Sequence, residues 1–373
     1  MHNCYDRDRT AGGCSGGEGA LIASACSPLG FASEASGSIR TPCLFNGIYG
    51  FAITPGRVTV KGVVSPGYGA KEYVSTTIGV MGRSTRDLQL VVKNFVSSEV
   101  MIEYDFYVES RVWNDYALRL RDKFKIAIFP ENKFFELTEG QKRVMLVSIN
   151  KLAERGHAIV PFTFQTSYNL VEVFLEIASQ MLGATKEEFK DDFMVGEFQF
   201  IQKYHSPTLI TKAVQFVQGF FTSSPRIEYF TKLLKERKLD GFLSLFEVYQ
   251  QHLHDLNFYL KKEEIDAILI PGLSVAYNKG TSSELAITHF SHLFPCAGKL
   301  CAGAVPVDFS KPGEESYSDT FDDAITIAVK NNLKKSSGLP LGIQVCSARN
   351  QDEKCLTVMA IIEDIFKFKH IAI

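Results

Sequence analysis

The hydrophobic and polar positions of this chain alternate between short apolar runs and longer segments of helical period. Apolar runs at 124–129 and 158–162 have the length and composition of buried strands. Between them, Thr138 with Gln141 three residues later forms a capping box that predicts a helix start, and Gly156 predicts the helix end. The apolar positions on one face of this helix are Met145, Ile149, Leu152 and Ala153. Strand, helix and strand in this order predict a βαβ unit and a parallel or mixed sheet.

The pattern in the rest of the chain predicts further helices and strands. Ser84 and Asp87 form a second capping box, which precedes another amphipathic helix. Its apolar face consists of Leu88, Val91, Val92 and Phe95. Apolar runs at 266–271 and 338–345 predict strands, and the segment 352–367 predicts a closing helix. Together these elements predict an α/β fold with a central mixed sheet flanked by helices.

The segment 163–260 differs from its surroundings because it is rich in aromatic residues and helical in period. Its most concentrated aromatic residues are Phe198, Phe200, Phe216, Phe220 and Phe221. Buried aromatic side chains usually pack a core, which is one interpretation of this segment. The other is an apolar channel for an acyl chain or a cap that faces a membrane, since an apolar substrate needs an apolar route of entry.

Composition narrows the classes of function. The 373 residues carry a formal net charge of −2, so the chain has no basic surface typical of nucleic-acid binding. No run of eighteen apolar residues predicts a membrane span, and the first residues contain no signal peptide. The eight cysteines show no Cys-x-x-Cys spacing, which predicts free thiols, no metal site and a reducing compartment. We therefore expect an intracellular protein, cytosolic or peripherally bound to a membrane.

The chemistry is concentrated in the glycine- and serine-rich segment 12–40, which reads GGCSGGEGALIASACSPLGFASEASGSIR. No Gly-Lys-Ser/Thr follows its glycines, so it does not match a phosphate-binding loop. The polar residues before Gly12 cannot form the buried strand that a dinucleotide-binding motif requires. Gly13 to Gly17 match the Gly-x-Ser-x-Gly elbow, which would make Ser15 a nucleophile, but the elbow also needs a preceding strand.

The segment closely resembles the signature of the amidase signature family. The family's Gly-Gly-Ser-Ser-Gly-Gly block appears as Gly12-Gly13-Cys14-Ser15-Gly16-Gly17, and its Gly-Gly-Ser-Ile-Arg block as Ser36-Gly37-Ser38-Ile39-Arg40. The separation of Cys14 and Ser38, 38 − 14 = 24 residues, is that of the family pattern. Within the family the chain looks most like the animal fatty-acid amide hydrolases. The resemblance implies a single amidase domain over 1–373 that lacks the N-terminal portion of the fold.

The resemblance also implies a role for each matched position. Ser38 takes the position of the nucleophile, and Cys14 that of the serine that stands on a cis peptide bond and relays protons to a lysine. Backbone N–H groups of Ala35, Ser36, Gly37 and Ser38 would form the oxyanion hole, because an oxyanion needs donors that are already in place. Ser15 and Arg40 would support these residues, and no metal or organic cofactor is implied.

Two departures from the family pattern bear on function. A thiol at Cys14 is a weak hydrogen-bond donor and acceptor compared with a hydroxyl. No lysine precedes the signature, since Lys61 is the first in the chain. We therefore expect either hydrolysis of a carboxamide, with a fatty N-acyl amide as substrate, or an amidase fold that binds an acyl ligand or a partner without turnover. A homodimer and peripheral membrane contact are further expectations.

Overall fold

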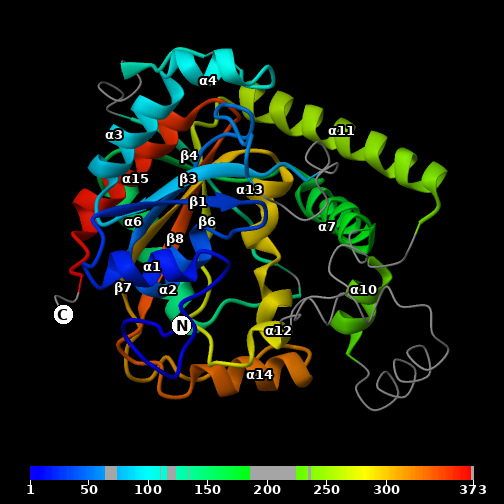
Figure 1. The fold of residues 1–373 in the computed structure, drawn as a ribbon. Helices are drawn as coiled ribbons and strands as arrows, with labels where there is room; N and C mark the ends of the chain where they lie inside the picture. The colour runs from blue at the N-terminus through cyan, green and yellow to red at the C-terminus, as the bar shows by residue number, and fades with distance from the viewer. Residues whose placement is uncertain are drawn as a thin grey trace.

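The computed structural model describes residues 1–63, 74–109, 111–115, 123–132, 134–184, 224–233 and 237–370. Among these residues, one mixed sheet lies at the centre with helices on both faces (Figure 1). The strands are β1 (Leu29–Glu34), β2 (Tyr49–Ala52), β3 (Thr77–Gly82), β4 (Lys125–Ile128), β5 (Ala158–Pro161), β6 (Ala267–Pro271), β7 (Cys301–Phe309) and β8 (Pro340–Ser347). Their order is β1-β3-β2-β7-β8-β6-β4-β5. The predicted α/β class with a mixed sheet is confirmed.

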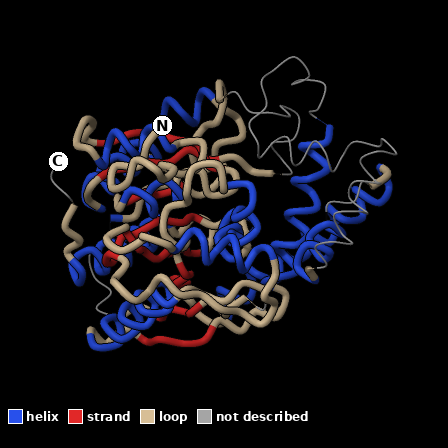
Figure 2. The backbone as a smooth tube through the Cα atoms, turned by 90° about the horizontal axis from the view of Figure 1, so that it is seen from below, coloured by secondary structure: helices blue, strands red, loops and turns tan. Residues whose placement is uncertain are grey.

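Helices flank the strands, as the view from below also shows (Figure 2). The first group is α1 (Gly16–Ala23), α2 (Arg40–Asn46), α3 (Thr85–Val96), α4 (Glu99–Tyr104), α6 (Glu139–Glu154), α7 (Ser167–Ala184), α10 (Pro225–Leu233) and α11 (Leu239–Lys262). The second is α12 (Ser282–Leu285), η3 (Ala286–His289), η4 (Ser291–Leu293), α13 (Phe294–Ala297), α14 (Ala324–Leu333) and α15 (Asp352–Phe366). Among the residues that the structure describes, no helix combines the length and the apolar character needed to cross a membrane.

The βαβ unit forms where the sequence predicts it. Strands β4 and β5 pair in parallel, with Ile126 opposite Ile159, and α6 connects them. Thr138 caps α6 through the predicted capping box with Gln141. One predicted core position is wrong, because Ala153 is exposed. The buried face of α6 passes through Met145 and Leu152. Ala153 is the next residue after Leu152, so its side chain is rotated by about 100° around the helix axis, toward solvent.

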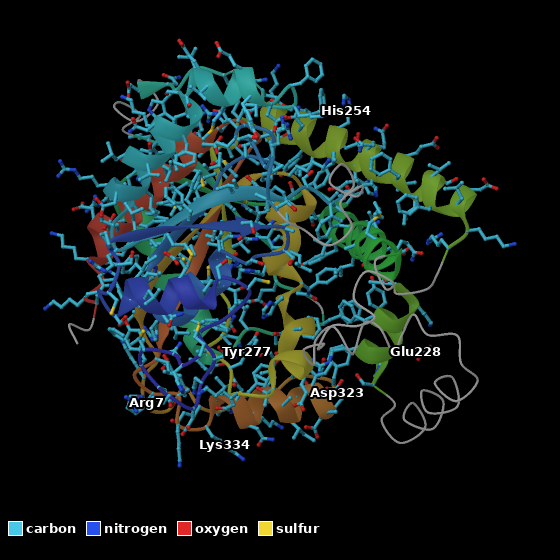
Figure 3. All side chains as sticks on the ribbon, viewed as in Figure 1. Arg7, Glu228, His254, Tyr277, Asp323 and Lys334 are labelled. Atoms are coloured by element: carbon cyan, nitrogen blue, oxygen red, sulfur yellow. The ribbon has the colours of Figure 1, made fainter. Side chains whose placement is uncertain are left out.

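The first residues of the chain are anchored by a buried arginine. The side chain of Arg9 is almost fully enclosed and donates to the carbonyl oxygens of Ala276 (2.7 Å), Asn332 (2.8 Å) and Lys334 (2.8 Å). Each donor of a guanidinium in this position needs an acceptor, because burying it unpaired is costly. Arg9 therefore joins the segment before the signature to the loop after β6 and to the end of α14, near Tyr277 and Lys334 in Figure 3.

The aromatic-rich segment contributes α7, α10 and most of α11, which lie on one side of the sheet (Figure 1). Helix α11 packs against α7, and α7 buries Leu170, Phe174 and Ile177. The predicted concentration of phenylalanines between 198 and 221 lies outside the described residues. A role for this segment in shaping a substrate channel stays a prediction.

Candidate active site

The candidate nucleophile lies where the chain reverses between β1 and α2. After β1 ends at Glu34, the backbone bends through residues 35–37 and turns at Ser38 before α2 begins. Gly37 has φ +105°, a conformation that residues with a Cβ rarely adopt. Ser38 is half-buried, while Ser36 is exposed. The small residues of the signature are therefore needed for the turn itself, and they leave Ser38 accessible from one side.

A buried ion pair closes this turn. The carboxylate of Glu34 accepts from Arg40 Nε at 2.7 Å, and both side chains are almost completely excluded from solvent. The second carboxylate oxygen accepts from the backbone N–H groups of Ile39 (2.9 Å) and Arg40 (3.2 Å). Hydrogen bonds that involve a charged group are stronger than neutral ones. Glu34 and Arg40 thus hold the two ends of the segment that carries Ser38.

Arg40 also connects the turn to two distant parts of the chain, the adjoining η4 and α13 segments and strand β8. Its guanidinium donates to the carbonyl oxygen of His292 (2.9 Å), to Gln344 Oε1 and to Cys296 Sγ (3.1 Å). Burial is the largest single effect and lowers the pKa of Arg40, but the charge and hydrogen bond of Glu34, together with the Cys296 and Cys346 thiols, outweigh it and the net pKa is raised. Burial raises the pKa of the Cys296 thiol to about 12, so Cys296 is a neutral partner here. Gln344 is held in turn by the carbonyl oxygen of Pro271 at 2.7 Å.

The two blocks of the signature pack against each other. A Cβ built on Gly13 would lie 3.6 Å from both Cα and O of Ser38, so the two residues are in close contact. Asn46 on α2 donates to the carbonyl oxygen of Ala11 at 2.7 Å, which fixes the first block against the second. The structure therefore brings the segment of Cys14 next to the segment of Ser38, although they are 24 residues apart in sequence.

Cys14 and Ser15 lie at the start of α1. Cys14 is exposed, and Ser15 occupies the N-cap position without a capping hydrogen bond from its side chain. The described residues contain no cis peptide bond, so the cis linkage that the resemblance implies at Cys14 is not found. The residues directly before Ser15 form no strand. The strand-to-helix elbow that would make Ser15 a nucleophile is therefore absent.

Two histidines, which the sequence pattern does not link to Ser38, lie close to the turn. The His292 ring contacts Gly37, and its Nε2 lies 3.0 Å from Thr41 Oγ1. His289 lies beside it with ring centroids 5.5 Å apart and bonds through Nε2 to Tyr277 Oη at 2.7 Å. No motif surrounds either histidine in the sequence, and His292 reaches the turn through a contact with Thr41, 251 residues away. Composition and spacing could not have identified them.

Both histidines are neutral at pH 7. Burial, followed by the positive charge of Arg40, lowers the pKa of His292 well below its ordinary value. The same two causes lower the pKa of His289 to about 4. A neutral imidazole keeps one N–H and one lone pair, so each ring can donate one hydrogen bond and accept another.

A small cavity of about 50 Å³ lies behind His292. Its wall includes the turn after β6, the η3 and η4 segments, and side chains from α6 and α14. Lining residues with polar side chains include Gln141, Ser274, Thr288, Ser291, His292 and Asn332. The volume is large enough for a few water molecules and too small for a long acyl chain.

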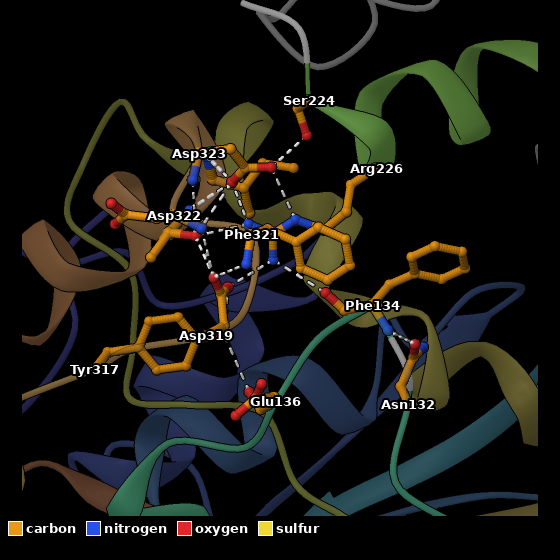
Figure 4. Close-up of polar contacts among 12 residues, drawn as sticks. Asn132, Phe134, Glu136, Ser224, Arg226, Tyr317, Asp319, Phe321, Asp322 and Asp323 are labelled. Carbon is orange, nitrogen blue, oxygen red and sulfur yellow. Dashed lines mark hydrogen bonds and ion pairs between the residues drawn. The ribbon is translucent and has the colours of Figure 1, made fainter.

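Next to this cavity, a buried charge cluster fastens α10 to the start of α14 (Figure 4). Arg226 has no exposed side-chain surface and pairs with Asp319 (2.8 Å) and Asp323. Ser224 also donates to Asp323, which caps α14. Burial raises the pKa of Asp323, but the hydrogen bonds of Arg226 and Ser224 outweigh it and the net pKa is lowered. Arg226 further donates to the carbonyl oxygen of Phe134 at 3.0 Å, and Phe135 lines the cavity.

The first lysine of the chain, Lys61, contacts Tyr104. Lys61 Nζ donates to the carbonyl oxygen of Tyr104 at 3.3 Å and lies 4.2 Å from the centroid of its ring. It is exposed. Lys61 therefore does not take the place of the buried lysine that the resemblance implies as a base.

The fold and the signature together are those of the Amidase family. Residues 1–356 match the model of the Amidase family, and the chain belongs to that family. Fatty-acid amide hydrolase 1 of Sus scrofa is 25% identical over 374 residues, which cover 97% of this chain and 63% of the relative. Fatty acid amide hydrolase 1 of Caenorhabditis elegans is also 25% identical, over 97% of this chain and 64% of the relative.

A solved structure titled fatty acid amide hydrolase shares the fold with a TM-score of 0.78. It is 20% identical in sequence, and the match covers 99% of this chain and 61% of that one. The chain thus spans a little under two thirds of the length of these relatives. The likeness in structure establishes the fold.

Proposed function

We propose that this chain hydrolyses a carboxamide through an acyl-enzyme on Ser38. The observation that carries the proposal is the geometry of the turn, in which the buried Glu34–Arg40 pair holds Ser38 half-exposed in the second signature block, next to the first. A rigid turn of this kind reduces the reorganisation needed when charge develops during attack.

In the proposed reaction, Ser38 Oγ attacks the carbonyl carbon of the amide. Backbone N–H groups of residues 35–38 stabilise the oxyanion that forms, and collapse of this intermediate expels the amine and leaves an acyl ester on Ser38. Water then attacks the ester and releases the carboxylic acid. The proton that leaves Ser38 passes through Cys14 to a general base, and the protonated base returns it to the nitrogen of the departing amine. A thiol relays a proton less well than a hydroxyl.

The proposed substrate class is a fatty N-acyl amide. Two relatives bear the name of fatty-acid amide hydrolases. A contiguous and largely buried aromatic cluster lies between the sheet and the helices α7 and α10, and a channel for an acyl chain would need apolar walls of this kind. Its members include Phe129, Phe162, Tyr168, Phe230, Phe290 and Phe294.

A serine-reactive fluorophosphonate tests the nucleophile. We expect labelling at Ser38 that is lost in Ser38→Ala and retained in Ser33→Ala, whose side chain is exposed on β1. Hydrolysis of primary amides with short and long acyl chains tests the substrate, and a preference for long chains is expected. Labelling that survives Ser38→Ala and is lost in Ser15→Ala would contradict the assignment of the nucleophile.

A second candidate function is an amidase fold that binds an acyl ligand without turnover. Cys14 at the relay position favours it, because a thiol is a weaker hydrogen-bond donor and acceptor than a hydroxyl. Loss of members of a catalytic unit leaves only the rate that the oxyanion hole and substrate binding supply. Saturable binding of a fatty amide, with no product and no labelling at Ser38, would support this function over hydrolysis.

A further inference from the structure

His292 occupies the space that a side chain at position 37 would need. A Cβ built on Gly37 would lie 2.0 Å from Nε2 and 2.5 Å from Cδ2 of His292. These distances are far below van der Waals contact, so the imidazole packs directly on the Gly37 backbone. His292 itself is 1% exposed, and its ring therefore has little freedom to move away.

The same residue contacts the chain on the other side of Ser38. His292 Nε2 lies 3.0 Å from Thr41 Oγ1, and a hydroxyl can serve either tautomer because it both donates and accepts. The carbonyl oxygen of His292 accepts from Arg40 Nη1 at 2.9 Å. The backbone N–H of Thr41 donates to the carbonyl oxygen of Gly37 at 2.8 Å, which closes the turn. His292 thus touches both ends of the segment 37–41 that contains Ser38.

We propose that His292 is a positioning residue for the nucleophile turn, holding the Gly37 peptide so that its neighbouring N–H groups and Ser38 keep the geometry needed for attack. The claim that His292 affects catalysis rests on the proposed function. The claim that His292 holds the Gly37 peptide in place does not depend on that function. His292 acts through Gly37 and Thr41 and needs no contact with the substrate.

Amide hydrogen exchange tests the structural part without any turnover. In His292→Ala, the Thr41 N–H loses the fixed orientation of its acceptor on Gly37, and we expect its exchange to accelerate by tenfold or more. The matched control is His289→Ala, which removes an adjacent imidazole that is bonded to Tyr277. This control should leave the exchange of the Thr41 amide within about twofold of the parent, since local stability differs from one part of a protein to another.

Kinetics test the catalytic part. We expect His292→Ala to lower kcat, or the rate of Ser38 labelling, by about 10²-fold, as a small misplacement of reacting groups can do. KM should change by less than about threefold, because substrate binding is not altered. Added imidazole should restore part of the rate in His292→Ala. His292→Asn, which can still bond Thr41, should lose less than His292→Ala and also serves if the alanine variant does not fold.

Each outcome decides a different claim. Unchanged Thr41 exchange in both His292 variants would overturn the inference, as would equal acceleration in His289→Ala. A parent chain without hydrolysis or labelling would contradict the proposed function, while Thr41 exchange would still decide the role of His292. A rise in KM with unchanged kcat in His292→Ala would show that His292 affects substrate binding and would overturn the positioning role.

Discussion

Replacing Arg40 with methionine should destabilise the fold strongly, because it leaves the Glu34 carboxylate buried without its cation. Arg40 is fully buried, and its guanidinium has partners on Glu34, His292, Gln344 and Cys296. Breaking a buried ion pair by removing one partner typically costs about 3–5 kcal/mol. That loss is a large part of the roughly 5–15 kcal/mol by which native proteins are stable.

Urea unfolding followed by circular dichroism measures this cost. With a loss of about 4 kcal/mol and an m value of about 3 kcal/mol/M, the midpoint should fall by roughly 1.3 M. The surface pair Lys142–Glu139 supplies a matched control, since its side chains are 44% and 57% exposed. Lys142→Ala should cost no more than about 0.5 kcal/mol.

A double variant separates the unpaired charge from lost packing. Arg40→Met combined with Glu34→Gln removes both charges, while the amide oxygen of glutamine can still accept from the backbone of Ile39. We expect this variant to recover more than half of the stability lost in Arg40→Met, because no buried charge is left unpaired. A cost below about 1 kcal/mol for Arg40→Met alone would refute the view that this pair holds the turn.

Three further changes test other parts of the molecule. The pKa of His289 is lowered from 6.5 to about 4, so between pH 6.5 and pH 4 only the unfolded chain takes up a proton at this residue. Lowering the pH from 6.5 to 4 should therefore reduce the free energy of unfolding by at most about 3 kcal/mol. This figure is an upper bound because the His289 side chain keeps some contact with solvent. Urea unfolding at a series of pH values measures the slope, and His289→Gln should flatten it. Arg226→Met should cost about 3–5 kcal/mol and accelerate amide exchange in α10, because Asp319 and Asp323 lose their shared cation (Figure 4); unchanged exchange in α10 would contradict its role as an anchor. Cys14→Ser should raise the rate of Ser38 labelling roughly tenfold, a part of the 10²–10⁴-fold that general acid–base assistance contributes, and Cys14→Ala should not raise it.

Local features of the fold could be predicted from the sequence because neighbouring residues determine them. The capping box at Thr138 forms as predicted, since a cap and its partner are three residues apart on the same chain segment. At Ser84 one half of the predicted box forms, in which the side chain accepts from the backbone N–H of Asp87. The strands at 124–129 and 266–271 form for a similar reason, because an apolar run of that length must be buried whatever lies next to it. The turn at Gly37 also follows from the small residues of the signature.

The surroundings of Ser38 were decided by tertiary structure alone. Glu34 and Arg40 are visible in the sequence, but their burial depends on His292 and Gln344, which are 252 and 304 residues from Arg40. No local pattern encodes such a separation, because the sheet order that places β8 beside β7 and β6 sets it. The sequence by itself determined which residues match the amidase signature, where the capped helix at Thr138 begins, and where the apolar strands at 124–129 and 266–271 lie. The tertiary structure decided which side chains enclose them, because burial and ion pairing depend on segments that meet only when the sheet is complete.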